Sequence, residues 1–379
     1  MAFEFIQERL AHQHSTDRYR ERRCVATQSG REVTIGNKTY LNFSSNDYLG
    51  LNNHPKINQA MQEGIDRFGL CSSASSLITG FHYAHQALEA KVCDWLNKPK
   101  CLLYSSGFSA NLGVLQALGQ ENTAIWLDKL SHASLIDGAL STKAKVKRFL
   151  HNDIDQLDNY LTNTNVKSNL IVSEGVFSMD GDQANVEALN GLAKKHDAWT
   201  YLDDAHSIGI TGRQGQGSVS IADVDIVMAT FGKAIATSGA FVACDEAVFD
   251  YLVNFSRHYM YSTAISPALA WATKSSISII QQEQWRRDKI SELSQILSTK
   301  LNPSIEIIPT ESSVHAIVIG KEDKALAVCE KLKEKGIWLT AIRPPTVPAN
   351  GSRLRVTVCA SHTLKDIKYL GECVNEVLV

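Results

Sequence analysis

The sequence predicts an α/β protein with a mostly parallel sheet covered by helices. From about residue 86, helical patterns such as Gln86 to Leu96 and Ala110 to Leu118 alternate with short apolar runs. The apolar runs are Cys101 to Tyr104, Ala124 to Leu127, Leu170 to Val172, Trp199 to Leu202 and Ile226 to Ala229. Short apolar runs separated by helices are typical of parallel strands that are buried on both faces.

The two ends of the chain have a different pattern. Phe3 to Arg23 has a helical pattern, and Tyr40 to Gly50 resembles a short strand that enters a loop. After about residue 265 the expected helices and strands are Ala268 to Leu297, Ile305 to Ile308, His315 to Ile319, Lys324 to Lys335, Ile337 to Ile342, Arg353 to Val358 and Leu364 to Val377. We therefore expect an N-terminal arm at 1–45, a large domain at 46–265 and a small C-terminal α+β domain at 266–379.

Composition excludes several classes of protein. The 379 residues carry 38 Lys+Arg against 40 Asp+Glu, a net charge of −2, so nucleic acid is not an expected partner. The eight cysteines form no C-x-x-C pair and are expected to be reduced, with no metal site. The N-terminus lacks the pattern of a targeting peptide and no apolar stretch is long enough for a bilayer, so we expect a cytoplasmic protein without membrane contact.

Polar residues follow the predicted strands at the sheet edge where ligands bind in open parallel sheets. Ser105 to Phe108 follows the first run and opens a helix, whose free N–H groups suit a phosphate. His132 and the stretch Glu174 to Asp182 follow the next two runs. Asp203 to His206 and Thr230 to Lys233 follow the last two.

Each of these residues alone has an ordinary explanation as a turn residue, a surface histidine or a solvated lysine. A carboxylate such as Asp203 at a buried strand end costs free energy unless it meets a cation or a donor. A lysine in the position of Lys233 suits Schiff-base chemistry. Together, the phosphate donors, the carboxylate, the imidazoles and the lysine match the needs of pyridoxal 5'-phosphate (PLP).

At these residues the sequence resembles the α-oxoamine synthase family of fold-type I PLP-dependent transferases. The resemblance spans nearly the whole chain and rests on Asn42 to Gly50, Glu174 to Asp182, Asp203 to His206, Thr230 to Lys233, Ala341 to Pro348 and Arg353 to Arg355. The most specific stretch is Ala-Ile-Arg-Pro-Pro-Thr-Val-Pro followed by Arg-Leu-Arg. The resemblance implies a large domain with a mostly parallel sheet and a smaller C-terminal α+β domain.

The resemblance also implies a role for individual residues. Lys233 forms the Schiff base, Asp203 pairs with the pyridine nitrogen, His206 bonds the phenolic oxygen and His132 stacks on the ring, which makes these four the expected catalytic residues. The other cofactor contacts are Gly107, Phe108, Ser178, Thr230 and Thr263, of which Thr263 serves the second subunit of a homodimer. The substrate contacts are Arg20, Asn46, His132, Thr346 and Arg355, with Arg20, Asn46 and Arg355 at carboxylate-binding positions.

The implied reaction condenses L-alanine with pimeloyl-CoA or pimeloyl-acyl carrier protein to give 8-amino-7-oxononanoate, carbon dioxide and free thiol in biotin biosynthesis. In this reaction Lys233 removes the Cα proton of L-alanine while Asp203 keeps the pyridine nitrogen protonated. A glycine-using member of the family, such as 2-amino-3-ketobutyrate CoA ligase, would share every cofactor residue and is the alternative.

One segment departs from the family pattern. Cys71 to Ile78 reads Cys-Ser-Ser-Ala-Ser-Ser-Leu-Ile where the family usually has a glycine-rich turn. Serine and alanine restrict positive φ and close approach by a ligand, so we expect an effect on acyl specificity.

Other classes fit less well. Gly212 to Gly217 does not follow the first strand as a dinucleotide-binding motif requires, and Gly107 to Asn111 is not the G-x-S-x-G of an α/β hydrolase. A non-catalytic binding protein would have little reason to combine Lys233, Asp203 and His206.

Overall fold

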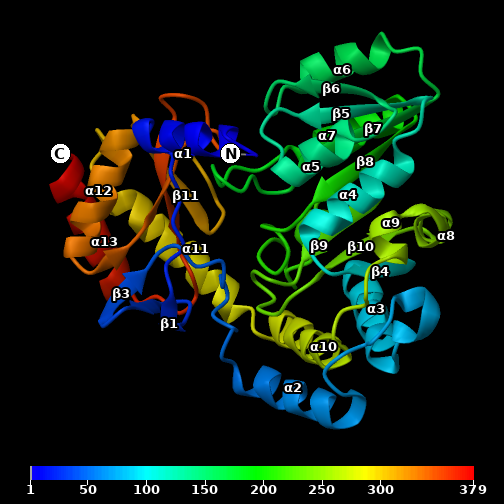
Figure 1. Ribbon diagram of the computed structural model, residues 1–379, viewed down its shortest axis with the longest axis horizontal. Helices are drawn as coiled ribbons and strands as arrows, with labels where there is room; N and C mark the ends of the chain where they lie inside the picture. The colour runs from blue at the N-terminus through cyan, green and yellow to red at the C-terminus, as the bar shows by residue number, and fades with distance from the viewer. Residues whose placement is uncertain (1) are drawn as a thin grey trace. The chain divides into compact units, whose positions relative to one another are not determined.

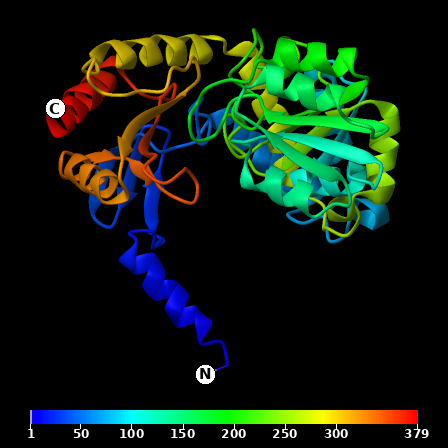
Figure 2. The same cartoon turned by 90° about the horizontal axis from the view of Figure 1, so that it is seen from above.

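The computed structural model describes residues 2–379, which form two compact units (Figure 1, Figure 2). The first unit contains the chain up to Gly50 together with 179–182 and 288–379. The second contains 51–178 and 183–287. These limits differ from the boundaries expected at residues 45 and 265, and the domain division at those residues stays a prediction. No helix within residues 2–379 is long and apolar enough to span a bilayer.

The second unit contains a seven-stranded sheet with the order β4-β10-β9-β8-β7-β5-β6. Its strands are β4 (Lys100–Tyr104), β5 (Thr123–Asp128), β6 (Lys145–Phe149), β7 (Ser168–Glu174), β8 (Ala198–Asp203), β9 (Ile226–Thr230) and β10 (Ala240–Cys244). Strands β6, β5, β7, β8 and β9 pair in parallel, and β10 runs antiparallel to both β4 and β9. The predicted mostly parallel sheet is confirmed.

Sequence reasoning missed two of these strands. β6 reads Lys-Val-Lys-Arg-Phe and lies at the edge of the sheet, where charged side chains keep it from forming an apolar run. β10 is apolar, but it follows β9 without an intervening helix and therefore breaks the alternation on which the prediction relied.

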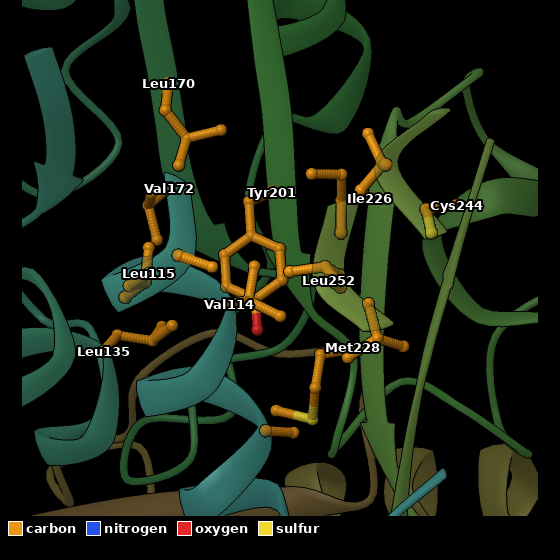
Figure 3. Close-up of a cluster of buried hydrophobic side chains, with 14 of the residues drawn as sticks. Val114, Leu115, Leu135, Leu170, Val172, Tyr201, Ile226, Met228, Cys244 and Leu252 are labelled. Carbon is orange, nitrogen blue, oxygen red and sulfur yellow. The ribbon is translucent and has the colours of Figure 1, made fainter. Parts of the chain in front are cut away.

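Helices cover both faces of this sheet (Figure 2). They are α2 (Pro55–Phe68), α3 (Tyr83–Leu96), α4 (Gly107–Leu118), α5 (Ala133–Leu140), α6 (Ile154–Thr162), α7 (Val186–Lys195), α8 (Glu246–Phe255), α9 (Arg257–Met260) and α10 (Pro267–Gln282). Because side chains alternate along a strand, Tyr201 packs against α4, α5 and α8 on one face, as Figure 3 shows, while Leu202 packs with α6 and α7 on the other. All the strand ends that carry the candidate site belong to this unit.

The first unit is an α+β unit with two small sheets. One sheet has the order β1 (Val25–Gln28), β2 (Glu32–Ile35), β3 (Lys38–Asn42) and β12 (Ile337–Trp338), and the other has the order β11 (Val314–Gly320), β14 (Ser352–Thr357) and β13 (Thr340–Ile342). The helices are α1 (Phe5–Ser15), α11 (Trp285–Lys300), α12 (Glu322–Glu334) and α13 (Leu364–Leu378). Apolar residues of α11, α12 and α13 pack with those of β11 and β14 in one core.

Four expected elements differ in the structure. The helix expected over Phe3 to Arg23 extends only over Phe5–Ser15. The single helix expected over Ala268 to Leu297 is two helices, because the main chain of Glu283 leaves helical geometry (φ −103, ψ 61) and Arg287 donates to the carbonyl of Ile280 at 2.7 Å. The strand expected at Ile305 to Ile308 is only an isolated bridge between Ile307 and Ile317, since Pro309 directly after it cannot donate to a ladder. The strand expected at Ile337 to Ile342 is divided between two sheets.

Candidate active site

Lys233 and His206 lie side by side at the carboxyl ends of β8 and β9. The Nζ of Lys233 is 2.6 Å from the Nε2 of His206, and His206 is buried. Thr230 is the last residue of β9 and donates from its hydroxyl to the carbonyl of Gly239 at 3.0 Å. The sequence-predicted lysine, histidine and threonine therefore share one sheet edge.

Asp203 ends β8 and its carboxylate is held by two donors. The main-chain N–H of Ala205 donates to Oδ1 at 2.9 Å, and the side-chain amide of Asn111 donates to Oδ2 at 2.8 Å. Asn111 lies in α4, and the hydroxyl of Tyr201 donates to its Oδ1 at 2.6 Å. These two donors give the carboxylate of Asp203 a fixed orientation. The residue is buried, at 5% exposure.

His132 is the N-cap residue of α5, and its main chain is fixed by Glu174. The N–H of His132 donates to Oε1 of Glu174 at 2.5 Å, and the N–H of Ser178 donates to Oε2 at 3.3 Å. Burial raises the pKa of Glu174 well above its usual value, the charge of Asp203 raises this pKa further, and Lys233 opposes the rise. One buried carboxyl group therefore ties together the loops that carry His132 and Ser178.

The N-terminus of α4 lies at the same sheet edge. Ser106 caps this helix by accepting from the N–H of Ser109 at 3.1 Å, and Gly107 is its first residue. The N–H groups of Gly107 and Phe108 occupy the first turn, where an α-helix gives them no internal partner. The ring of Phe108 meets that of His132 edge to face, with centroids 6.3 Å apart.

Thr263 lies between α9 and α10, next to the segment that departs from the family pattern. Its main chain pairs with Ser75, and the N–H of Ala264 donates to the carbonyl of Ala74 at 3.0 Å. Ser72 donates from its hydroxyl to the carbonyl of Ile265 at 2.6 Å. Ser72 to Ser75 therefore holds the loop of Thr263 through these contacts with its main chain.

Arg355 and Asn46 meet in the first unit. The guanidinium of Arg355 donates to Oδ1 of Asn46 at 3.3 Å, to the hydroxyl of Tyr48 at 3.3 Å and to that of Thr357 at 3.2 Å. Burial raises the pKa of Tyr48, so this tyrosine stays neutral beside the cation. The cluster provides a buried positive charge with fixed hydroxyl neighbours.

A second arginine pair in this unit joins Arg20 to Thr346, whose side chains are 3.3 Å apart. Both residues line a cavity of about 810 Å³. Arg343 lines it too and donates to the main-chain carbonyls of Asp17 and Tyr19, at 3.4 Å for Tyr19. Burial lowers the pKa of Arg343, and the charge of Arg20 lowers it further.

The neighbouring arginines of the N-terminal segment have other partners. Arg18 pairs with Glu322 at 3.0 Å, and Arg23 lies 4.0 Å from Glu330 and over the ring of Trp338. The contact with Thr346 therefore distinguishes Arg20 from Arg18 and Arg23.

The donor set at the sheet edge fits PLP. It offers an amine at Lys233, a carboxylate oriented by two donors at Asp203, an imidazole at His206 and the free N–H groups of a helix N-terminus for a phosphate. Across the described residues 2–379, no three His, Cys, Asp or Glu side chains gather as they would around a metal ion.

Comparison with known proteins identifies the family. The model of class I and II aminotransferases matches residues 38–374. The chain belongs to the class I and II aminotransferase family. A variant of serine palmitoyltransferase from S. paucimobilis, solved with a bound PLP–myriocin aldimine, superimposes with a TM-score of 0.92 at 26% identity, over 99% of this chain and 97% of that chain. The predicted PLP cofactor and the fold-type I transferase fold are confirmed, and the chain is a PLP-dependent enzyme.

Closer relatives share one name. This chain is 44% identical over 366 residues to 8-amino-7-oxononanoate synthase of Photobacterium profundum, covering 95% of this chain and 93% of the relative. The same enzyme of Salmonella paratyphi B is 42% identical over 372 residues, with 97% of each chain covered. A crystal structure of 8-amino-7-oxononanoate synthase from Francisella tularensis superimposes with a TM-score of 0.77 at 27% identity, over 89% of this chain and 97% of that chain.

Sequence reasoning missed Asn111 and Ser134, which join the site through side-chain hydrogen bonds. Asn111 donates to Ser134 at 2.8 Å as well as to Asp203. The available signal was a lone amide in the otherwise apolar stretch Ala110 to Leu115, since a buried amide in a helix needs partners.

Proposed function

We propose that this enzyme condenses L-alanine with a pimeloyl thioester and releases carbon dioxide and free thiol, giving 8-amino-7-oxononanoate. Relatives with 41% to 44% identity over nearly the full chain carry the name of that activity. The observation that carries the chemistry is the 2.6 Å contact between Lys233 and His206 beside the oriented carboxylate of Asp203.

Lys233 holds the cofactor and moves the proton at the Cα of the amino acid. Bound PLP supplies the electron sink that stabilises the carbanion at this carbon. The imidazole of His206 contacts the amine of Lys233 directly and can exchange a proton with it. The carboxylate of Asp203, oriented by its two donors, would pair with the pyridine nitrogen and favour the protonated ring.

His132 orients the reacting groups. Its main chain is tied to Glu174, and the edge of the Phe108 ring limits where its own ring can lie. A ring with its main chain and its position fixed in this way suits stacking against a flat cofactor. The N–H groups of Gly107 and Phe108 contribute donors for the phosphate.

In the first unit, Arg355 and Arg20 each pair with a polar side chain, and each pair suits one of the two substrate carboxylates. Arg355 with Asn46 is a small buried cluster, which suits the carboxylate of L-alanine. Arg20 with Thr346 lines a cavity of about 810 Å³, which suits the far carboxylate of a pimeloyl chain. An acetyl thioester has no such carboxylate, so this pair favours the longer diacid.

The active form is a homodimer in which Thr263 of each chain contributes to the phosphate site of the other. The support is that Thr263 lies in a loop held by main-chain contacts to Ala74 and Ser75, beside the exposed side chains of Leu77 and Ile78. An exposed apolar segment beside a proposed cofactor contact is consistent with burial against a second copy.

A thiol-release assay tests the reaction. Purified protein is given L-alanine or glycine with pimeloyl-CoA, pimeloyl-acyl carrier protein or acetyl-CoA. We expect release only with L-alanine and a pimeloyl thioester, and the ratio of the two pimeloyl rates identifies the preferred carrier. Faster release with glycine and acetyl-CoA would instead support the glycine-using ligase.

A further inference from the structure

A continuous chain of side-chain hydrogen bonds joins the two groups proposed to face the cofactor ring. The amide nitrogen of Asn111 donates to Oδ2 of Asp203 and to the hydroxyl of Ser134, each at 2.8 Å. The hydroxyl of Ser134 is 2.7 Å from the Nδ1 of His132. Both Asn111 and Ser134 are buried, at 1% and 0% exposure, so water does not compete for these bonds.

The direction of each bond follows from what the groups can donate. A carboxylate only accepts, so the nitrogen of the Asn111 amide faces Asp203, and its oxygen accepts from Tyr201. Both amide hydrogens are then used, one on Asp203 and the other on Ser134.

The hydroxyl of Ser134 accepts from Asn111 and is left with one hydrogen of its own, which points to the Nδ1 of His132. The main-chain N–H of Ser134 also faces this nitrogen, at 3.3 Å, and can only donate. The Nδ1 of His132 is therefore an acceptor, and the proton of the neutral ring is on Nε2.

We propose that Asn111 is a positioning residue that orients the carboxylate of Asp203 and, through the hydroxyl of Ser134, keeps His132 neutral with its proton on Nε2. The proposal rests on the functions proposed above for Asp203 and His132. Asn111 lies four residues after Gly107 in α4. The helix whose N-terminus presents N–H groups for a phosphate therefore also orients the carboxylate of Asp203 that is proposed to pair with the pyridine ring.

Several charged groups affect the pKa of His132 in addition to the hydrogen bonds through Asn111 and Ser134. Burial lowers the pKa of His132, Asp203 and Asp137 raise it, and Lys233 lowers it. The carboxyl group of Glu174 contacts the main chain of this residue. The experiment must therefore change the hydroxyl of Ser134 without moving any of these charges.

Ser134→Ala makes that change. We expect the pKa of His132 to rise in the variant, because the ring loses a donor that favours its neutral form. The measurement is exchange of the imidazole C2 hydrogen against pH by mass spectrometry, on protein freed of cofactor. Ser141→Ala is the matched control, since Ser141 also accepts from an amide of α4, that of Gln116 at 3.0 Å, and it should leave the pKa of His132 unchanged.

Asn111→Asp tests the hydrogen bond between Asn111 and Asp203, at the other end of the hydrogen-bond chain. The new carboxylate has the shape of the amide but cannot donate, and it repels Asp203. We expect PLP to bind about tenfold more weakly or worse, as for the loss of a hydrogen bond to a charged group. Affinity is measured by fluorescence titration of the cofactor-free protein, with Gln116→Glu as the control for an amide-to-acid change in α4.

The two arms separate failure of this proposal from failure of the proposed function. Wild-type affinity for PLP in Asn111→Asp, or an unchanged His132 pKa in Ser134→Ala, would overturn the role of Asn111 while leaving the reaction intact. Absence of thiol release by the wild type would overturn the proposed reaction, yet the exchange measurement would still test the chain of bonds. If Asn111→Asp does not fold, Tyr201→Phe removes only the hydroxyl that holds the amide and should also weaken PLP binding, whereas wild-type affinity would count against the proposal.

Discussion

The amine of Lys233 lies 2.6 Å from the imidazole of His206, so two groups that can donate or accept a proton are in contact at the ends of neighbouring strands. Lys233→Ala should reduce turnover at least about 10³-fold, because both the covalent anchor and the base are lost. Borohydride reduction followed by peptide mapping should label Lys233 in the wild type and nothing in the variant. Lys195→Ala, on the exposed end of α7, is the control. A label on another lysine would contradict the assignment.

The two arginine pairs predict opposite kinetic effects. Lysine keeps the charge of arginine but not its forked geometry, so Arg355→Lys should raise the KM for L-alanine about tenfold or more and leave that of the thioester nearly unchanged. Arg20→Lys should raise the KM for the pimeloyl thioester instead. Steady-state kinetics with each substrate varied in turn measures both. Arg18→Lys, which alters the pair with Glu322, is the control, and equal effects of both variants on one substrate would contradict the division.

The homodimer can be tested by complementation. Hybrids between Lys233→Ala and Thr263→Ala chains should recover about half the wild-type activity or less, since one of the two sites regains both residues. Each variant alone should be far less active than the hybrid. The measurement is activity after mixed refolding, with subunit composition checked by mass spectrometry. A wild-type monomer with full activity would exclude the arrangement.

Two buried histidines in the first unit should make its stability depend on pH. Burial lowers the pKa of His315 and of His362 to about 4 from the usual 6.5. The Nδ1 of His362 accepts from the N–H of Cys359 at 3.1 Å, and its Nε2 lies 3.1 Å from the carbonyl of Asn42, so folding requires the neutral ring. The unfolded chain binds a proton below pH 6.5 and the folded chain does not until about pH 4.

These two rings should therefore add no pH dependence above about pH 7, and their contribution to stability should fall between pH 6.5 and 4, by roughly 3 kcal/mol for each histidine. Urea unfolding at several pH values measures this. His315→Leu removes one titrating ring and should weaken the dependence by about half. His12→Gln, at an exposed position, should leave it unchanged. A profile of the His315→Leu variant that matches the wild type would show that burial of this ring is not the cause.

The site residues at the strand ends could be predicted from the sequence, because each of them follows an uninterrupted apolar run. Asp203 and Lys233 stand just after such runs, and the carboxyl ends of parallel strands necessarily meet at one edge. The chain through Asn111 and Ser134 could not be predicted in the same way. Its bonds join a helix to a strand end and to a helix cap, so they depend on the packing of α4 against α5 rather than on any local pattern. The end of α10 at Glu283 likewise carries no Gly or Pro signal.

The last prediction concerns the segment Cys71 to Ile78, where a serine in place of a glycine strains the main chain. Ser73 adopts φ +61, which a residue with a Cβ rarely does. Ser73→Gly should remove this strain and stabilise the protein by about 1 kcal/mol, whereas Ser73→Ala should not. Thermal unfolding of the two variants compares them directly.

The kinetic consequence of Ser73→Gly and Ala74→Gly distinguishes two functions for this segment. If it borders the acyl chain, as the family resemblance implies, the variants should change the KM or the chain-length preference for the thioester and leave binding of L-alanine almost unchanged. The main-chain contacts of Ala74 and Ser75 with the loop of Thr263 offer the other outcome. In that case the greater main-chain freedom of glycine would disturb the loop of Thr263. The affinity for PLP would then fall, while the acyl preference stayed the same. We expect the first result, because glycine at 74 or 73 leaves the main-chain groups that hold the loop in place.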